Sequence, residues 1–96
     1  MVRILWVEDN SFTAKVFTKM MEQLGYNEVT FETGRDAGSN ALRRIREENF
    51  DVVLTDRMMP SIDGWDVIEA VRDADTTDAK PLTPVLMVCV IASLIS

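Results

Sequence analysis

The stretch from Asp51 to Gly64 reads Asp-Val-Val-Leu-Thr-Asp-Arg-Met-Met-Pro-Ser-Ile-Asp-Gly, and its pattern predicts the fold. The apolar run at residues 52–54 indicates a parallel strand covered on both faces, because such strands are hydrophobic at nearly every position. Asp56 follows at the carboxyl end of this run, where open α/β sheets bind their ligands. A proline and an Asp-Gly pair then favour a turn. From this stretch alone, Asp56 is either a functional carboxylate or a residue that caps a loop.

Apolar patterns on both sides of this stretch predict strands that alternate with helices. We expect strands at Val2–Val7, Val29–Phe31, Asp51–Thr55 and Val85–Val90, and helices at Phe12–Leu24, from Ser39 or Asn40 to about Asn49, and at Trp65–Ala74. Asn10 or Ser11 can cap the first helix, and Gly25 favours a left-handed end to it. The polar segment 73–84 carries two prolines and is predicted to be a loop. The alternation predicts a parallel sheet with helices on both faces and right-handed crossovers.

The composition predicts one acidic domain. The chain has 96 residues with 16 acidic and 10 basic side chains, and its net charge of −6 argues against nonspecific binding to nucleic acid. It contains no histidine, and therefore no imidazole for phosphoryl donation or zinc binding. Its single cysteine, Cys89, cannot form an intramolecular disulfide, so we expect a cytoplasmic location. The longest apolar run holds roughly a dozen residues, too few to span a membrane.

Two adjacent carboxylates, Glu8 and Asp9, end the first predicted strand. If the first and third strands are neighbours, Glu8, Asp9 and Asp56 converge at one edge of the sheet. Three converging carboxylates repel one another, so they need a cation or must take up protons. An all-oxygen site suits Mg²⁺, and an aspartate can act as a nucleophile toward phosphorus. The alternative is that Glu8 and Asp9 only cap the helix that follows.

Three motifs together carry a resemblance to a known family. The first strand ends in Val-Glu-Asp-Asn at residues 7–10, and Asp56 is followed by Met-Met-Pro and then by Asp63-Gly64. The segment 38–42, Gly-Ser-Asn-Ala-Leu, matches the opening of the family's second helix. With these motifs, the chain resembles the receiver domain of two-component response regulators over residues 2 to about 88.

This resemblance implies a fold, a reaction and a set of site residues. The fold is a flavodoxin-like, doubly wound parallel sheet, here with about four strands in the order 2-1-3-4 and three helices. Asp56 is implied as the acceptor of a phosphoryl group from a histidine kinase or phosphotransfer protein. Glu8, Asp9, Asp56 and the backbone carbonyl of Met58 are implied as ligands of Mg²⁺, and Pro60 and Gly64 shape the loop after the acceptor. The chain would be a signalling module and not an enzyme.

The sequence also departs from the family pattern. Residues 1–96 are expected to form a single receiver-like domain without the family's fourth helix, fifth strand and fifth helix. Cys89 takes the place of a serine or threonine at the end of the fourth strand, and a thiol is a weak donor. Lys80 precedes that strand and does not match the phosphate-binding lysine of the fifth strand. We therefore expect impaired switching, and the alternative is a non-switching, dimerising interaction module or a truncated receiver.

The apolar tail at residues 85–96 predicts self-association. A long hydrophobic edge strand favours pairing with another chain, and exchange of a segment between chains is a second route to a dimer. We expect a homodimer through the edge of the fourth strand and this tail, with edge pairing and domain swapping both left open. Neither nucleic acid nor a membrane is expected as a partner.

Overall fold

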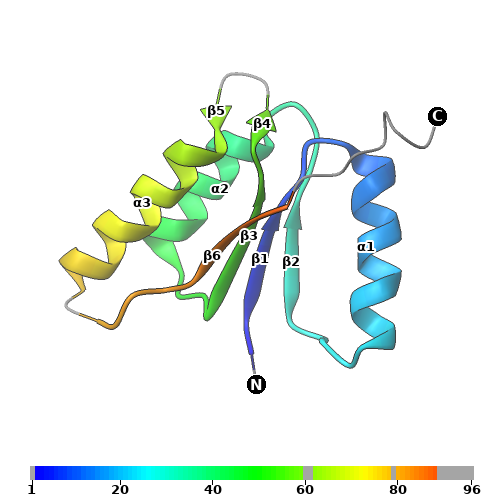
Figure 1. Cartoon of the computed structure of the whole chain (residues 1–96), viewed down its shortest axis with the longest axis horizontal. Coiled ribbons are helices and arrows are strands. Elements are labelled where there is room, and N and C mark those ends of the chain that lie inside the picture. The colour runs from blue at the N-terminus through cyan, green and yellow to red at the C-terminus, as the bar shows by residue number, and fades with distance from the viewer. Residues whose placement is uncertain (1, 60–61, 79, 89–96) are drawn as a thin grey trace.

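A parallel sheet with helices on both faces makes up the computed structural model, which describes residues 2–59, 62–78 and 80–88. The strands of this sheet are β1 (Ile4–Val7), β2 (Val29–Glu32), β3 (Val52–Asp56) and β6 (Val85–Val88), in the order β2-β1-β3-β6 (Figure 1). The helices are α1 (Ser11–Gln23), α2 (Ala37–Glu47) and α3 (Gly64–Thr77). This arrangement confirms the predicted flavodoxin-like α/β fold.

The central strand β1 sets the register of the sheet. All four of its residues are buried, and it pairs in parallel with β2 on one side and β3 on the other. Val7 lies opposite Thr55, so the residues that follow β1 reach the same edge as the last residue of β3. On the other side of β3, Asp56 lies opposite Val88 of β6. The register thus brings the carboxyl ends of β1, β3 and β6 together.

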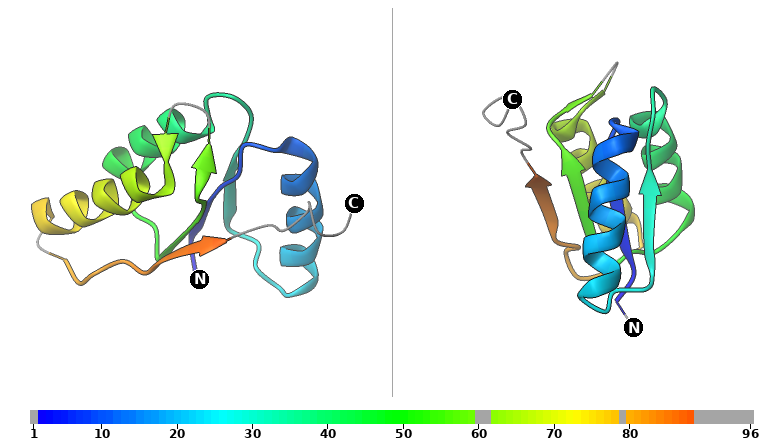
Figure 2. Two further views of the ribbon diagram at one scale, coloured as in Figure 1. Left: turned by 45° about the horizontal axis from the view of Figure 1, so that its top comes forward. Right: turned by 90° about the vertical axis from the view of Figure 1, so that its right-hand side faces the viewer.

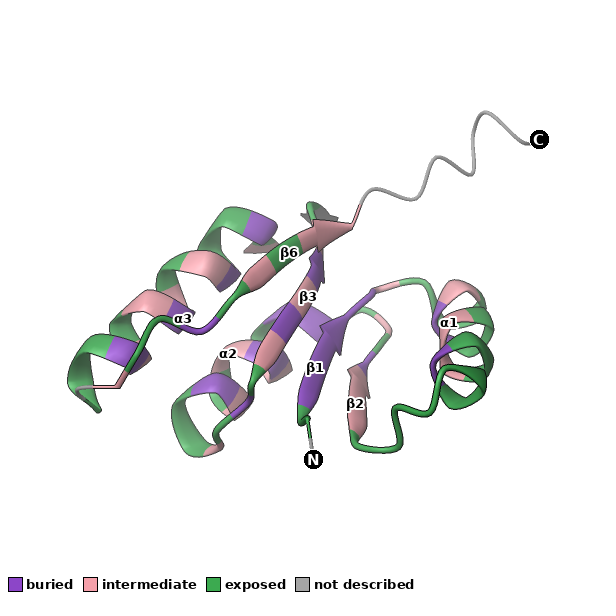
Figure 3. Ribbon diagram, turned by 60° about the horizontal axis from the view of Figure 1, so that its bottom comes forward, coloured by how far each residue is buried: buried purple, intermediate pink, exposed green. Residues whose placement is uncertain are grey.

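The helices divide the core into two apolar layers. Figures 1 and 2 show α2 and α3 on one side of the sheet and α1 on the other. Leu5, Val7 and Val53 pack in the layer beneath α2 and α3, and Trp6 packs beneath α1. The Trp6 ring stacks on Phe17, with 4.4 Å between ring centroids. Figure 3 shows that buried residues concentrate on β1 and on the sides of the helices that face the sheet.

The apolar stripe of α1 is only partly used in this core. Ala14 and Met21 are buried, whereas Phe12, Val16 and Met20 are exposed. Residues four apart in a helix advance by about 40° around its axis, because one turn takes 3.6 residues. A stripe that recurs every fourth residue therefore leaves the face that points at the sheet. Its outer part stays uncovered by the described residues.

Several predicted boundaries were wrong. Helix α2 begins at Ala37, before Ser39 or Asn40, because Gly34 adopts a φ of +85° and the amide of Ala37 already donates to the Gly34 carbonyl. Helix α3 extends to Thr77, through the first part of the segment predicted as a loop, because the polar Asp75 faces inward.

Smaller differences concern the strands. Strand β3 begins one residue later than predicted and includes Asp56, and β2 extends to Glu32. The fourth parallel strand ends at Val88 within the described residues, and the predicted end at Val90 lies outside them. A short antiparallel pair, β4 (Met58–Met59) and β5 (Ile62–Asp63), was not predicted. Two-residue strands carry too little pattern for a periodicity argument.

Candidate active site

Three carboxylates meet at the carboxyl edge of the sheet. Glu8 and Asp9 follow β1, and Asp56 ends β3, its parallel neighbour. One carboxylate oxygen from each side chain lies within 4.8 Å of the others. Among the described residues this is the only group of three or more acidic, cysteine or histidine side chains close enough to hold a metal ion. The convergence expected from the strand order is therefore present, while the roles of the three residues remain predictions.

Glu8 is the buried member of this cluster. Its side chain is 2% exposed, and one oxygen, Oε1, accepts a hydrogen bond of 3.2 Å from the amide of Asn10. The other oxygen, Oε2, is buried and has no hydrogen-bond partner among the described residues. Burial raises the pKa of Glu8 from 4.5 to about 7, and the nearby charges of Asp56 and Asp9 act in the same direction against the Asn10 amide. The site therefore needs a proton or a cation to balance its charge.

Other residues supply the helix caps that were the alternative explanation for these carboxylates. Asn10 caps α1, since its Oδ1 accepts a 3.0 Å hydrogen bond from the amide of Thr13. Asp63 caps α3 by accepting from the amide of Trp65, and Asp66 accepts in return from the amide of Asp63. The capping box at Asp63 was not predicted, although its Asp-x-x-Asp spacing at residues 63–66 was a readable signal.

Backbone hydrogen bonds hold the acidic pair in place. The amide of Glu8 donates to the carbonyl of Glu32 at 3.0 Å, which extends the pairing of β1 with β2 by one residue. The carbonyl of Asp9 accepts from the amide of Gly34, also at 3.0 Å. The loop after β2 therefore packs against the acidic pair, and the positive φ of Gly34 is what turns the chain there.

The loop after Asp56 packs tightly against two glycines. A Cβ atom on Gly64 would lie 2.8 Å from the carbonyl oxygen of Asp56 and 3.0 Å from the Cα of Arg57. The amide of Gly64 donates to the Arg57 carbonyl at 2.7 Å. A Cβ on Gly38 would lie 2.8 Å from the Cβ of Ile62. Both glycines therefore let the β4–β5 hairpin lie close to α2 and to the start of α3.

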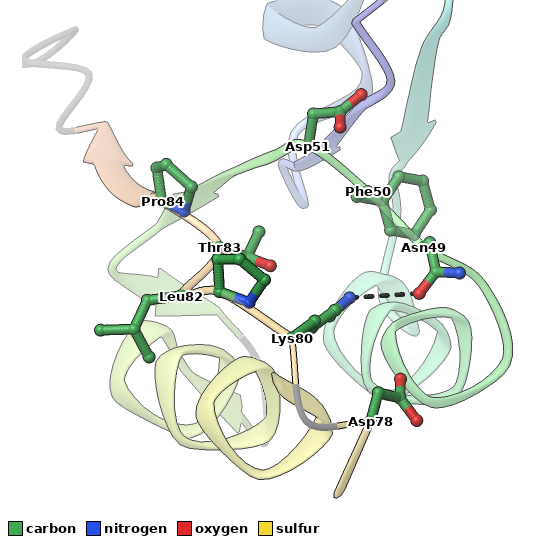
Figure 4. A pocket seen from close by; sticks show the side chains of 9 residues that line it. Asn49, Phe50, Asp51, Asp78, Lys80, Leu82, Thr83 and Pro84 are labelled. Atoms are coloured by element: carbon green, nitrogen blue, oxygen red, sulfur yellow. Dashed lines mark hydrogen bonds between the residues drawn. The ribbon is translucent and has the colours of Figure 1, made fainter. Parts of the chain in front are cut away.

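The remaining predicted site residues are placed as follows. Met58 opens β4, two residues after Asp56, and its assignment as a carbonyl ligand stays a prediction. Pro60 and Cys89 lie outside the described residues. Lys80 lies at the opposite edge of the sheet, where its Nζ donates to Asn49 Oδ1 at 3.1 Å (Figure 4). Lys80 is therefore held away from the acidic cluster, as its sequence position led us to expect.

A cavity of about 640 Å³ also lies at that opposite edge, between the segments 49–51 and 80–84 (Figure 4). The residues that line it come just before β3 and β6 in the chain. The cavity therefore lies at the amino ends of these strands, and the length of the sheet separates it from Asp56. Ligands of open α/β sheets bind at the carboxyl ends of the strands, where the three carboxylates lie. The acidic cluster is therefore the candidate active site.

In the part of the chain that the structure describes, no helix has the length and hydropathy needed to cross a membrane.

The fold and the cluster define an α/β domain of flavodoxin-like topology with a carboxylate site at the edge of its central strands. The chain belongs to the response regulator receiver domain family, whose family model matches residues 4–94. This finding confirms the resemblance seen in the sequence. Receiver domains are signalling modules of two-component systems.

Proteins from several organisms are similar to this chain. The response regulator receiver protein CpdR of Brucella abortus is 38% identical over 78 residues, which cover 81% of this chain and 59% of CpdR. The transcriptional regulatory protein PcoR of Escherichia coli is 34% identical over 77% of this chain and 31% of PcoR. The hybrid signal transduction histidine kinase B of Dictyostelium discoideum is 30% identical over 79% of this chain and 4% of the kinase. The chain thus spans 59% or less of the length of these relatives.

A solved structure shows the same fold. The receiver domain of the sensor histidine kinase PA1611 from Pseudomonas aeruginosa PAO1 aligns with a TM-score of 0.62 at 22% identity, covering 90% of this chain and 84% of that domain. The crystal structure of that domain has a magnesium ion coordinated in its active site cleft.

Proposed function

We propose that this domain receives a phosphoryl group on Asp56 in a two-component phosphorelay, with Mg²⁺ as the cofactor. The observation that carries the proposal is the convergence of Glu8, Asp9 and Asp56, with ligand oxygens within 4.8 Å of one another. A carboxylate oxygen of Asp56 would attack the phosphorus of a phosphohistidine. The new O–P bond gives an acyl phosphate, and the electron pair of the broken N–P bond leaves with the imidazole.

The donor set of the cluster fits Mg²⁺. All its side-chain donors are carboxylate oxygens, which hard cations prefer, and the buried Oε2 of Glu8 has no partner among the described residues. Glu8, Asp9 and Asp56, with the backbone carbonyl of Met58, would hold the ion. When bound, Mg²⁺ supplies positive charge that offsets the repulsion between the carboxylates and an incoming phosphoryl group.

The proposed phosphoryl donor is a histidine kinase or a phosphotransfer protein. Residues 1–96 contain no histidine, so the donating imidazole would lie outside this domain. Two of the relatives are named as histidine kinases, one from Dictyostelium discoideum and one from rice. A cytoplasmic location is part of the proposal and rests on the single cysteine. We also expect this chain to switch weakly. The family pattern includes a phosphate-binding lysine, and Lys80 cannot take that role because it is bound to Asn49 at the far edge of the sheet.

The test is intact mass spectrometry after incubation with acetyl phosphate and Mg²⁺. We expect one phosphoryl adduct, which is lost in Asp56→Asn and when Mg²⁺ is removed with a chelator. Asp36→Asn is the matched control, since Asp36 is exposed at the same edge and makes no side-chain cap bond. An adduct that persists in Asp56→Asn, or no adduct at any Mg²⁺ concentration, would contradict the proposal.

The second candidate function is a dimerising interaction module. The observation that favours it is the position of β6 at the edge of the sheet. Among the described strands, β6 pairs only with β3. Leu86 at its middle is 55% exposed. An open apolar edge strand is a template for pairing with another chain. The part of this proposal that concerns residues 89–96 lies outside the described residues.

Sedimentation over a range of concentrations tests this second function. We expect a dimer that dissociates in Leu86→Glu and persists in Leu82→Glu, a control at an exposed leucine outside β6. A monomer at the highest concentration would exclude this function and leave the phosphorelay proposal untouched.

A further inference from the structure

A groove of about 320 Å³ lies between α2 and α3. Both helices lie on the face of the sheet away from α1 (Figure 2). Its floor consists of Leu42, Ile62 and Ala70, all partly buried. These side chains come from α2, from β5 and from α3, so three separate elements meet in one apolar floor. A groove between two adjacent helices suits the apolar side chains of a third helix, which enter such grooves at spacings of three and four residues.

One wall of the groove is acidic. Asp66, Glu69 and Asp73 lie along α3 at spacings of three and four, which places them on one face of the helix. The carboxylate of Asp66 is used in the cap of α3. Glu69 and Asp73 are exposed and make no hydrogen bond or ion pair with the residues that the structure describes. Two carboxylates one helical turn apart are therefore available to an occupant of the groove.

The opposite wall does not neutralise this charge. Arg46 of α2 lines the groove, but its Nε donates to the carbonyl of Leu42 one turn earlier in the same helix, at 3.3 Å. Among the described residues, no salt bridge joins Arg46 to the acidic wall. With three carboxylates and one guanidinium around an apolar floor, the groove carries a net negative charge.

The floor of the groove is connected to the candidate active site. Ile62 belongs to the β4–β5 hairpin, which begins two residues after Asp56. The same residue packs on Gly38 so closely that a Cβ on the glycine would lie 2.8 Å from the Cβ of Ile62. An occupant of the groove would therefore contact the loop that follows the acceptor.

We propose that the α2–α3 groove is a docking surface for a basic amphipathic helix of a partner protein. The apolar stripe of that helix would cover Leu42, Ile62 and Ala70, and lysine or arginine side chains on its flank would pair with Glu69 and Asp73. The charge of the groove selects a basic partner over an acidic one. This docking goes beyond phosphoryl acceptance and does not depend on it.

The test is an NMR titration of the ¹⁵N-labelled full chain with two synthetic helical peptides. Both peptides carry the same leucine stripe, and the flanking positions hold lysine in one and glutamate in the other. We expect the lysine peptide to shift the amide signals of Leu42, Ile62 and Ala70. It should bind about tenfold more tightly, because Glu69 and Asp73 attract lysine and repel glutamate. This preference should fall in about 1 M salt, where the Debye length is about 3 Å.

A double substitution localises the effect. Glu69→Lys with Asp73→Lys should weaken binding of the lysine peptide about tenfold or more, because two attractive charges become repulsive. The control, Glu22→Lys with Glu28→Lys, makes the same change in net charge at exposed residues outside the groove and should leave the affinity within about twofold. If the reversed groove variant loses its melting transition, Glu69→Gln with Asp73→Asn replaces it, with a smaller loss expected.

Three results would overturn the proposal. The two peptides could bind equally well, the shifts could centre on α1 or on the Glu8 cluster, or the control variant could lose as much affinity as the groove variant. A second copy of this chain is the competing occupant. Sedimentation would reveal it as self-association that the groove variant abolishes without added peptide, and that result would also overturn the partner proposal. None of these outcomes depends on whether Asp56 accepts a phosphoryl group.

Discussion

Two buried carboxylates at opposite edges of the sheet differ in almost every respect except burial. Glu8 is 2% exposed and Asp75 is 1% exposed. The carboxylate of Asp75 accepts hydrogen bonds of 2.7 Å from both the amide and the hydroxyl of Thr83, and one of 2.8 Å from Arg72. Lys80 adds a salt bridge at 3.6 Å. Glu8 accepts one amide hydrogen bond, and its second oxygen has no partner among the described residues.

The electrostatic consequences of these surroundings are opposite. Burial works against the charge of Asp75, but the Thr83 hydrogen bonds and the charges of Lys80 and Arg72 outweigh it and lower its pKa below 3.8. Burial raises the pKa of Glu8 to about 7, and its neighbours Asp56 and Asp9 add repulsion. Asp75 therefore stabilises the chain as an anion, whereas Glu8 as an anion costs stability. A buried carboxylate held at such a cost is a mark of a functional site.

The largest expected effect on stability comes from removing the Asp75 carboxylate and its hydrogen bonds. Asp75→Ala should lower the free energy of unfolding by about 2–4 kcal/mol, because it leaves the amide and the hydroxyl of buried Thr83 without an acceptor. Urea denaturation at neutral pH measures this loss. The lowered pKa means that the contribution is present above 3.8, the ordinary pKa of an aspartate, and is lost as the pH falls through the folded value. A loss that does not shrink in acid would argue against a charged Asp75.

Glu8→Gln should change the free energy of unfolding in the opposite direction. Without Mg²⁺, we expect the variant to be more stable than the wild type by about 1–3 kcal/mol at pH 8, because the raised pKa makes the anion unfavourable in the fold. The contribution of Glu8 is fully present below pH 4.5 and is lost as the pH rises through about 7. The two proteins should therefore unfold at similar urea concentrations near pH 4.5. Equal stability of the two proteins at pH 8 would show that the charge of the Glu8 anion is compensated in the fold, which would contradict this prediction.

Thr83→Val measures what the Thr83 hydroxyl alone contributes to holding Asp75. The variant keeps the amide hydrogen bond to Asp75 and loses the hydroxyl one, so it should cost about 1–2 kcal/mol at neutral pH. Denaturation beside Thr77→Val, an exposed threonine on α3, provides the control. If Thr83→Val lost as much stability as Asp75→Ala, the hydroxyl and not the charges would account for the contribution of Asp75.

The smallest change in intrinsic stability is expected at Asp9. Without Mg²⁺, Asp9→Ala should alter the free energy of unfolding by no more than about 0.5 kcal/mol, because Asp9 is only partly buried. The stabilisation by Mg²⁺, about 2.7 kcal/mol at a hundredfold excess over Kd, should be largely lost in the variant. Thermal melts with and without Mg²⁺ measure both quantities. An unchanged Mg²⁺ effect in Asp9→Ala would remove Asp9 from the proposed ligand set.

The sequence predicted the main parts of the fold and the site from strong local signals. Apolar runs marked the strands, and the strand order placed Glu8, Asp9 and Asp56 at one edge. Boundaries were weaker, as the early start of α2 at Ala37 and the extension of α3 to Thr77 show. Hydrophobic periodicity treats a polar residue such as Asp75 as a sign of the surface. Only its partners, eight residues away at Thr83, make it part of the interior.

By itself, the sequence determined the α/β alternation, the acidic residues that end the strands, and the left-handed turn at Gly25, whose φ is +88°. These features depend on residues close together in the chain, so a local pattern is enough to reveal them. The tertiary structure alone decided which of two buried carboxylates is satisfied, how closely Gly38 and Gly64 let the hairpin approach, and that a charged groove lies where α2 packs against α3. Each of these depends on distances between residues far apart in the sequence, and those distances exist only after the chain has packed.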